Sequence, residues 1–216
     1  VRSDKIHTLT VKAGKTTGIS LTDVEQLGSL TIYKEGEVLV GWNGSNFTYE
    51  TRKLPGATFK VTAGADIYKA DGTKVYNKGD VIAENLVSGS DGQAVLSDLH
   101  LGTYVVTETK SIDGYTISTT PQTVKIEYKD QNVTVQAEST TIKNSRQKAE
   151  VSVVKKDSDT DNPLTGGQYT LYAGNDIKNY DGKVIATKGA ALQTVTTGAD
   201  GKATYTVDLP ISNSFY

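Results

Sequence analysis

Three polar side chains occur at the ends of apolar stripes, in segments whose residues alternate as they do in β-strands. Residues two apart in a strand share one face, so Lys34, Glu108 and Asn144 each face the same way as the apolar residues before them. Those apolar residues are Leu30 and Ile32, Tyr104 and Val106, and Ile142. Burying an amine, a carboxyl and a carboxamide apart from one another would cost several kcal/mol. We therefore expect the three groups to meet if their stripes face a common core.

The surrounding sequence is typical of short strands joined by tight turns. Apolar and polar residues alternate through 29–34, and Thr and Val recur in similar runs elsewhere. Glycine follows aspartate or lysine at four candidate turns: Asp71-Gly72, Lys78-Gly79, Asp91-Gly92 and Asp113-Gly114. No segment shows a sustained apolar period of about 3.6 residues. The sequence therefore predicts an all-β protein, with a β-sandwich as the arrangement.

An internal repeat relates the middle of the chain to its last third. Residues 54–59 (Leu-Pro-Gly-Ala-Thr-Phe) return as residues 164–169 (Leu-Thr-Gly-Gly-Gln-Tyr), an offset of 164 − 54 = 110. After a slip of one residue, 89–94 (Gly-Ser-Asp-Gly-Gln-Ala) match 198–203 (Gly-Ala-Asp-Gly-Lys-Ala). Similarity at a nearly fixed offset predicts two copies of one structural unit.

A second internal match predicts the module boundaries. Asp23 precedes the strand of Lys34 by 34 − 23 = 11 residues, and Asn144 precedes Lys155 by 155 − 144 = 11. We therefore expect three parts: residues 1–26 are the last strands of one module, 27–148 are a complete module, and 149–216 are the front of a following, truncated module. The linkers lack Ser/Gly/Pro tracts, so adjacent modules should be joined stiffly.

Several motifs, taken in order, resemble a known family. The opening strand 28–34, the segments 54–59 and 90–94, and the Gly-x-Tyr-x-Val-x-Glu strand 102–108 followed by 113–115 (Asp-Gly-Tyr) are similar to those of Cna protein B-type, or SpaA-like pilin, domains. This resemblance extends over essentially the whole chain. It implies tandem Ig-like (prealbumin-like) β-sandwich modules of a Gram-positive surface adhesin or pilin.

The resemblance also implies an intramolecular isopeptide bond. The family's roles fall on Lys34 as nucleophile, Glu108 as proton shuttle and Asn144 as electrophile. A dry interior favours the neutral amine and the neutral acid that such a reaction needs, and folding supplies the proximity. The reaction would occur once per molecule, so the protein is not expected to be an enzyme. The alternative is that the three residues are ordinary strand ends in water.

The flanking segments carry incomplete versions of this site. Lys155 repeats the nucleophile position, but the matching Glu and Asn would lie beyond Tyr216. Asp23 occupies an acceptor position whose Lys and Glu would lie before Val1. One hypothesis is strand exchange, in which residues 1–26 of one chain complete residues 149–216 of another.

An aromatic hairpin follows the strand of Lys34. It contains the only tryptophan, Trp42, together with Phe47 and Tyr49. Such a cluster can anchor a ligand, here a host matrix protein or a glycan. The alternative is that these aromatic side chains cover the end of their own sandwich.

Other features exclude several classes of function. The 23 basic and 25 acidic side chains nearly cancel, which argues against nucleic-acid binding, and no apolar run is long enough to span a membrane. No cysteine is present, and His7 and His100 have no nearby metal-binding partner. Residues 157–162 are similar to the start of a calcium loop but lack its glycine, so a solvated turn is expected. No cofactor or metal is therefore predicted.

These observations together predict a structural role. We expect a stalk module of a cell-wall-anchored, extracellular protein, whose partners are the neighbouring modules and whose signal and anchor lie outside this sequence. Two alternatives remain: an adhesin module that binds its ligand through the Trp42 loop, and an accessory sandwich of an extracellular hydrolase.

Overall fold

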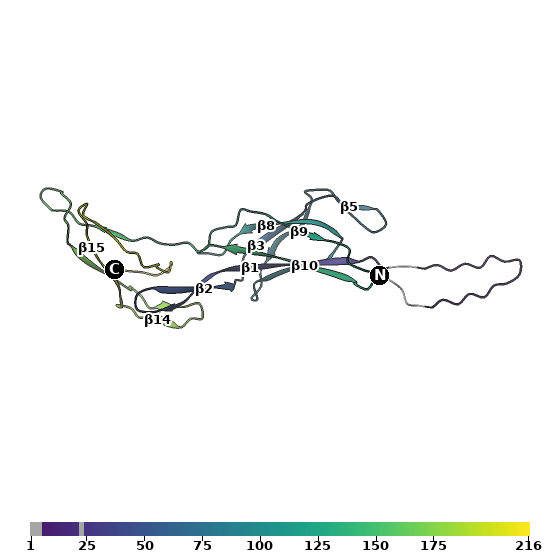
Figure 1. The fold of residues 1–216 in the computed structure, drawn as a ribbon, viewed down its shortest axis with the longest axis horizontal. Helices are drawn as coiled ribbons and strands as arrows, with labels where there is room; N and C mark the ends of the chain where they lie inside the picture. Colours follow the sequence, from purple (N-terminus) through teal and green to yellow (C-terminus); the bar gives the residue numbers. More distant parts are fainter. Residues whose placement is uncertain (1–5, 22–23) are drawn as a thin grey trace. The chain divides into compact units, whose positions relative to one another are not determined.

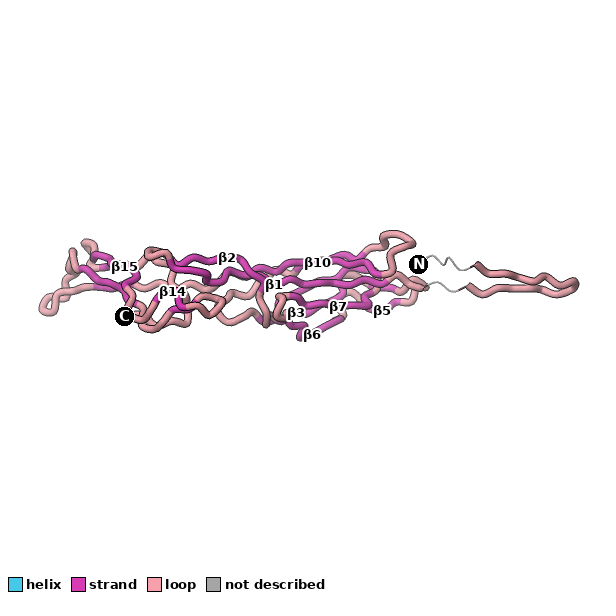
Figure 2. The backbone as a smooth tube through the Cα atoms, turned by 90° about the horizontal axis from the view of Figure 1, so that it is seen from below, coloured by secondary structure: helices cyan, strands magenta, loops and turns pink. Residues whose placement is uncertain are grey.

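The computed structural model describes residues 6–21 and 24–216, and within them every regular element is a β-strand (Figure 1). Figure 2 draws these strands in magenta and the connecting loops in pink. The all-β prediction is confirmed. None of the described residues forms a helix that is long and apolar enough to cross a membrane. The strands are β1 (Leu27–Trp42), β2 (Phe47–Lys53), β3 (Thr58–Ala63), β4 (Ile67–Tyr68), β5 (Lys74–Tyr76), β6 (Val81–Val87), β7 (Gln93–Leu99), β8 (Gly102–Lys110), β9 (Gln122–Ile126), β10 (Val135–Asn144), β11 (Ser152–Val154), β12 (Gln168–Tyr172), β13 (Ile177–Lys178), β14 (Val184–Ala186), β15 (Ala191–Thr196) and β16 (Lys202–Thr204).

The chain divides into two compact units. The first, unit 1, contains the chain up to Lys34 together with Leu54–Ser111 and Ile117–Ile142. Unit 2 is made of Glu35–Lys53, Ile112–Thr116 and Lys143–Tyr216. The hairpin after Lys34 therefore groups with the C-terminal segment, whereas the sequence prediction placed it within a module spanning 27–148.

Unit 1 is a β-sandwich. One sheet has the order β6-β3-β8-β9, and its strands are antiparallel, with Val61 of β3 opposite Val106 of β8. In the other sheet, the first half of β1 pairs with β7, placing Ile32 opposite Ala94, and β10 lies on the other side of β1. Burial alternates along β1 as the sequence predicts. The inward-facing residues form one core: Leu30, Ile32, Phe59, Val61, Tyr104, Val106, Val124, Ile126 and Ile142.

Unit 2 is built from two-stranded antiparallel ladders. These are the second half of β1 with β2, then β11 with β16, β12 with β15, and β13 with β14. Phe47 of β2 is buried in the core that these ladders share, beside Leu171, Ala173 and Ile177. The burial of Phe47 is the physical reason why the hairpin belongs to this unit.

The two copies of the sequence repeat make the same hydrogen bonds. Ser88 Oγ donates to Leu54 O at 3.0 Å, and Thr197 Oγ1 donates to Leu164 O at 2.8 Å. Both hydroxyl-bearing residues are about 2% exposed. Gly92 N donates to Gly89 O in the first copy, and the same bond recurs in the second. The repeat found in the sequence therefore has a matching local structure.

Candidate functional site

Lys34 is held in the interior of unit 1 by its own strand. Its backbone N–H donates to Gly92 O at 2.8 Å, and its carbonyl accepts from Leu54 N at 2.9 Å. These two bonds fix the backbone, and the alternation of β1 then directs the side chain inward beside Ile32. Lys34 is 0% exposed. The sequence prediction that this amine faces the core is consistent with this position.

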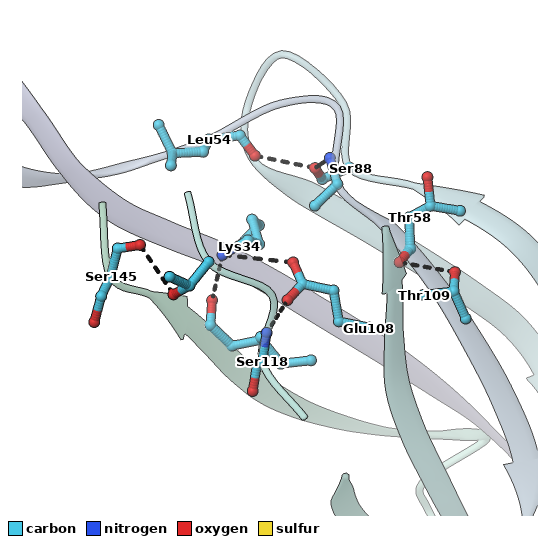
Figure 3. Close-up of polar contacts among 11 residues, drawn as sticks. Lys34, Leu54, Thr58, Ser88, Glu108, Thr109, Ser118 and Ser145 are labelled. Carbon is cyan, nitrogen blue, oxygen red and sulfur yellow. Dashed lines mark hydrogen bonds and ion pairs between the residues drawn. The ribbon is translucent and has the colours of Figure 1, made fainter. Parts of the chain in front are cut away.

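Glu108 lies beside the buried amine. It comes from β8, where it is paired with Phe59 of β3, and its Oε1 is 3.8 Å from Lys34 Nζ (Figure 3). Both side chains are fully shielded from solvent. Glu108 Oε2 accepts a hydrogen bond from Ser118 N at 2.7 Å, which fixes the orientation of the carboxyl group. The structure thus brings the predicted amine and the predicted acid together.

The strand that carries Asn144 passes close to the amine. Lys34 Nζ donates to the carbonyl of Ile142 on β10 at 3.4 Å. Asn144 is the last residue of β10, two positions further on, and it shares the buried face of that strand with Ile142. It is 5% exposed. Asn144 is therefore buried as predicted, whereas a bond between its side chain and Lys34 stays a prediction.

The arrangement can support proton transfer in a dry setting. An amine and a carboxyl without water nearby interact strongly and pay a large desolvation penalty if both are charged. Passing a proton between them relieves that penalty and leaves a neutral, nucleophilic amine. Within the described residues, no cluster of His, Cys, Asp or Glu is suited to hold a metal ion.

The sequence profile of the SpaA prealbumin-like fold domain matches residues 48–141. Over these residues the chain is similar to the SpaA prealbumin-like fold domain. Glu108 lies inside this match, and Lys34 and Asn144 lie just outside it. The assignment of roles to these two residues thus rests on the sequence motifs and on the burial of their side chains.

Solved structures are similar to this chain at low sequence identity. The TIE protein of Bacillus anthracis is 22% identical, with a TM-score of 0.51, over 83% of this chain and 26% of that one. The minor pilin GBS52 of Streptococcus agalactiae is 24% identical, with a TM-score of 0.38, over 57% of this chain and 46% of that one. The major pilin BcpA of Bacillus cereus is 19% identical, with a TM-score of 0.39, over 67% of this chain and 36% of that one.

The chain thus spans between about a quarter and a half of the length of these three structures. No curated protein sequence matches it.

The flanking sites differ from the site of Lys34 and Glu108. Lys155 makes the same backbone bonds as Lys34, because its N–H donates to Gly201 O at 2.8 Å and its carbonyl accepts from Leu164 N at 3.0 Å. Its side chain, however, is exposed. Asp23 lies outside the described residues. A crosslink at either position stays a prediction.

The aromatic hairpin packs into unit 2. Phe47 is 5% exposed within the core, and its ring centroid lies 4.5 Å from that of Trp42. Trp42 and Tyr49 are half-buried against the same core. This placement favours the packing interpretation of the hairpin, since Phe47 presents almost no surface to a ligand. Ligand binding by these three residues stays a prediction.

The acidic segment 157–162 forms the expected turn. Asp157 Oδ1 accepts from the N–H groups of Thr160 at 2.9 Å and Asp159 at 3.1 Å. The bond from the Thr160 backbone is the main cause that lowers the pKa of Asp157 below its ordinary value. The carboxylate therefore stabilises the turn by accepting hydrogen bonds from its backbone.

The sequence prediction missed a pair of buried hydroxyls and a buried arginine. The buried hydroxyls of Ser88 and Thr197 occupy equivalent positions in the repeat, so a closer alignment of the two copies could have identified them. Arg146 is almost buried, stacks 3.6 Å over the Tyr49 ring and pairs with Asp208. No local signal marks it, because its partners are distant in the sequence.

Proposed function

We propose that this chain is a stalk segment of an extracellular, Gram-positive surface protein, strengthened by a self-formed amide bond between Lys34 and Asn144. The observation that carries the proposal is the pairing of Lys34 with Glu108 at 3.8 Å, with neither side chain exposed. Such burial of an amine and an acid is costly unless the site has a use for it. Asn144, buried two residues after the carbonyl that Lys34 contacts, supplies the electrophile.

The reaction is balanced without any co-reactant. The Lys34 Nζ lone pair attacks Asn144 Cγ, and a Cγ–Nζ bond replaces the Cγ–Nδ2 bond. Nζ gives up one proton and Nδ2 gains one, so Nδ2 leaves as ammonia. Glu108 carries that proton and, when protonated, donates a hydrogen bond that polarises the amide carbonyl. Fixing the reactants in the fold can replace about 7–11 kcal/mol of the barrier.

The position of the bond suits a load-bearing module. Lys34 lies on the first strand of the sandwich, and Asn144 ends its last strand, β10. A covalent link between these strands gives tension a path that bypasses the hydrogen-bonded ladders of β3, β6 and β8. The partners of such a segment are the neighbouring modules of the same surface protein.

Intact mass tests the crosslink directly. The wild-type chain is expected to lack the mass of one ammonia, whereas Glu108→Ala should keep its full mass because the proton carrier is gone. Glu84→Ala is the matched control, since Glu84 is an exposed carboxylate on β6 of the same unit and should leave the ammonia loss intact. A wild-type chain of full mass after complete folding would contradict the proposal.

A further inference from the structure

A cavity in unit 2 has the features of a small-ligand site. Its volume is about 270 Å³, close to the lower end of the range for ligand pockets. It is formed by segments that are far apart in the sequence, including the β1–β2 hairpin, the 113–115 turn and residues 210–213. The side chains that bring polar or aromatic groups to it include Glu37, Tyr49, Tyr115, Arg146, Lys178 and Tyr180.

Three tyrosines give the cavity aromatic surface in fixed positions. Tyr115 donates to Glu37 O at 2.8 Å, and Tyr49 donates to Asp208 O at 3.0 Å, so both rings are oriented by their hydroxyls. Burial raises the pKa of Tyr49 and of Tyr115 above the ordinary tyrosine value, which keeps both phenols neutral. Tyr180 is 48% exposed, and the guanidinium of Arg52 lies 5.7 Å from the centroid of its ring.

Arg146 adds a buried donor that the described residues do not use fully. Its side chain is 8% exposed and forms an ion pair with Asp208. Its Nε lies 3.5 Å from Glu37 Oε2, but no hydrogen-bond acceptor in the described part of the chain satisfies the Nε–H. Buried donors without an acceptor are rare in folded proteins, so this one calls for an explanation such as a bound water or a functional role.

The charge of the lining points to a neutral ligand. Two acidic residues, Glu37 and Asp113, balance two basic ones, Arg146 and Lys178. A charged ligand would gain little from such a lining. A sugar fits it better, because its hydroxyls can donate and accept hydrogen bonds while its C–H face packs on a tyrosine ring.

We propose that this cavity binds one neutral sugar ring of a glycan. Of the three aromatic residues predicted from the sequence to contact a ligand, Tyr49 lines this cavity, whereas Trp42 and Phe47 do not. The proposal is independent of the proposed crosslink. It would give the stalk segment a weak adhesive contact in addition to its mechanical role.

Saturation-transfer NMR with a panel of neutral methyl glycosides (glucose, galactose, mannose and N-acetylglucosamine) at millimolar concentration tests the proposal. We expect saturation of at least one neutral glycoside and about a tenfold loss of affinity in Tyr180→Ala, which removes the exposed ring. Tyr128→Ala is the matched control, because Tyr128 is a 60% exposed tyrosine of unit 1, and this variant should bind as the wild type does. Asp113→Asn, a second variant at the exposed rim, should also weaken binding.

Glucuronate and N-acetylneuraminate serve as charged comparators. The proposal would be overturned if only the charged sugars, or no sugar at all, showed saturation. It would also be overturned if the neutral glycosides were saturated to the same degree in Tyr180→Ala as in the wild type. Unchanged Trp42 fluorescence in each variant verifies that unit 2 is folded. The intact mass of the same samples reports on the crosslink separately, so the two proposals can fail independently.

Discussion

At the scale of single residues, the properties of the site follow from the complete burial of the Lys34 and Glu108 side chains. An ion pair with the 3.8 Å separation of Nζ and Oε1 would add little to the stability of the fold if it lay on the surface, where such pairs contribute at most about 1 kcal/mol. In a dry interior the attraction is much stronger, but so is the penalty for any charge that loses its partner. Removing one of the two groups should therefore be more harmful than removing both.

A pair of substitutions measures this coupling without interference from the crosslink. In an Asn144→Ala background, which cannot form the amide, Lys34→Met should destabilise unit 1 by roughly 3–5 kcal/mol, because Glu108 is left buried without its counter-charge. Adding Glu108→Leu should recover most of that loss. Amide hydrogen exchange of β3 and β8 reports the free energy of opening of unit 1. A double variant no more stable than Lys34→Met would show that the pair does not interact energetically.

At the scale of the elements, alternation along the sequence predicted which face of each strand is buried. The stripes ending at Lys34, Glu108 and Asn144 are all inside, and the two copies of the repeat share the hydrogen bond of Gly92 and its counterpart Gly201. Alternation could not show which core receives a given face. Phe47 follows a strand of unit 1 in sequence, yet it packs with residues from β12 and β13, more than a hundred positions later. Such a partner is set by tertiary packing, which no local pattern records.

The packing of the hairpin predicts that a substitution in it destabilises unit 2 and leaves the stability of unit 1 unchanged. Phe47→Ala should destabilise unit 2 by about 3–5 kcal/mol, because it leaves a cavity beside Leu171 and Ile177. The single tryptophan, Trp42, packs against the same core, so the urea midpoint of its fluorescence reports on unit 2. Hydrogen exchange of β3 and β8 in unit 1 should not change.

Two controls sharpen this experiment. Phe59→Ala, at a fully buried position of unit 1, should show the opposite pattern, with faster exchange in β8 and an unchanged fluorescence midpoint. Thr48→Ala alters the exposed neighbour of Phe47 and should leave both readouts unchanged. Equal effects of Phe47→Ala on both readouts would mean that the hairpin is not specifically a core element of unit 2.

At the scale of the whole chain, the proposed amide closes a very long loop. Lys34 and Asn144 are 144 − 34 = 110 positions apart. By analogy with disulfides, closing a loop of about this length stabilises the folded state by up to about 5 kcal/mol, mainly by restricting the unfolded chain. The same closure limits how far the chain can be stretched, and this mechanical consequence distinguishes a crosslink from any noncovalent stabilisation.

Single-molecule pulling from the two ends of the chain measures this limit. An extended chain gains roughly 3.3–3.6 Å per residue, so the 110 positions between Lys34 and Asn144 hold roughly 380 Å of length. The wild type should unfold without releasing that length, because the amide carries the load past the loop. Glu108→Ala should release it, whereas Glu84→Ala should behave as the wild type does. If the wild type and Glu108→Ala reach the same final contour length, tension passes through the hydrogen-bonded strands, and the chain cannot act as an inextensible segment.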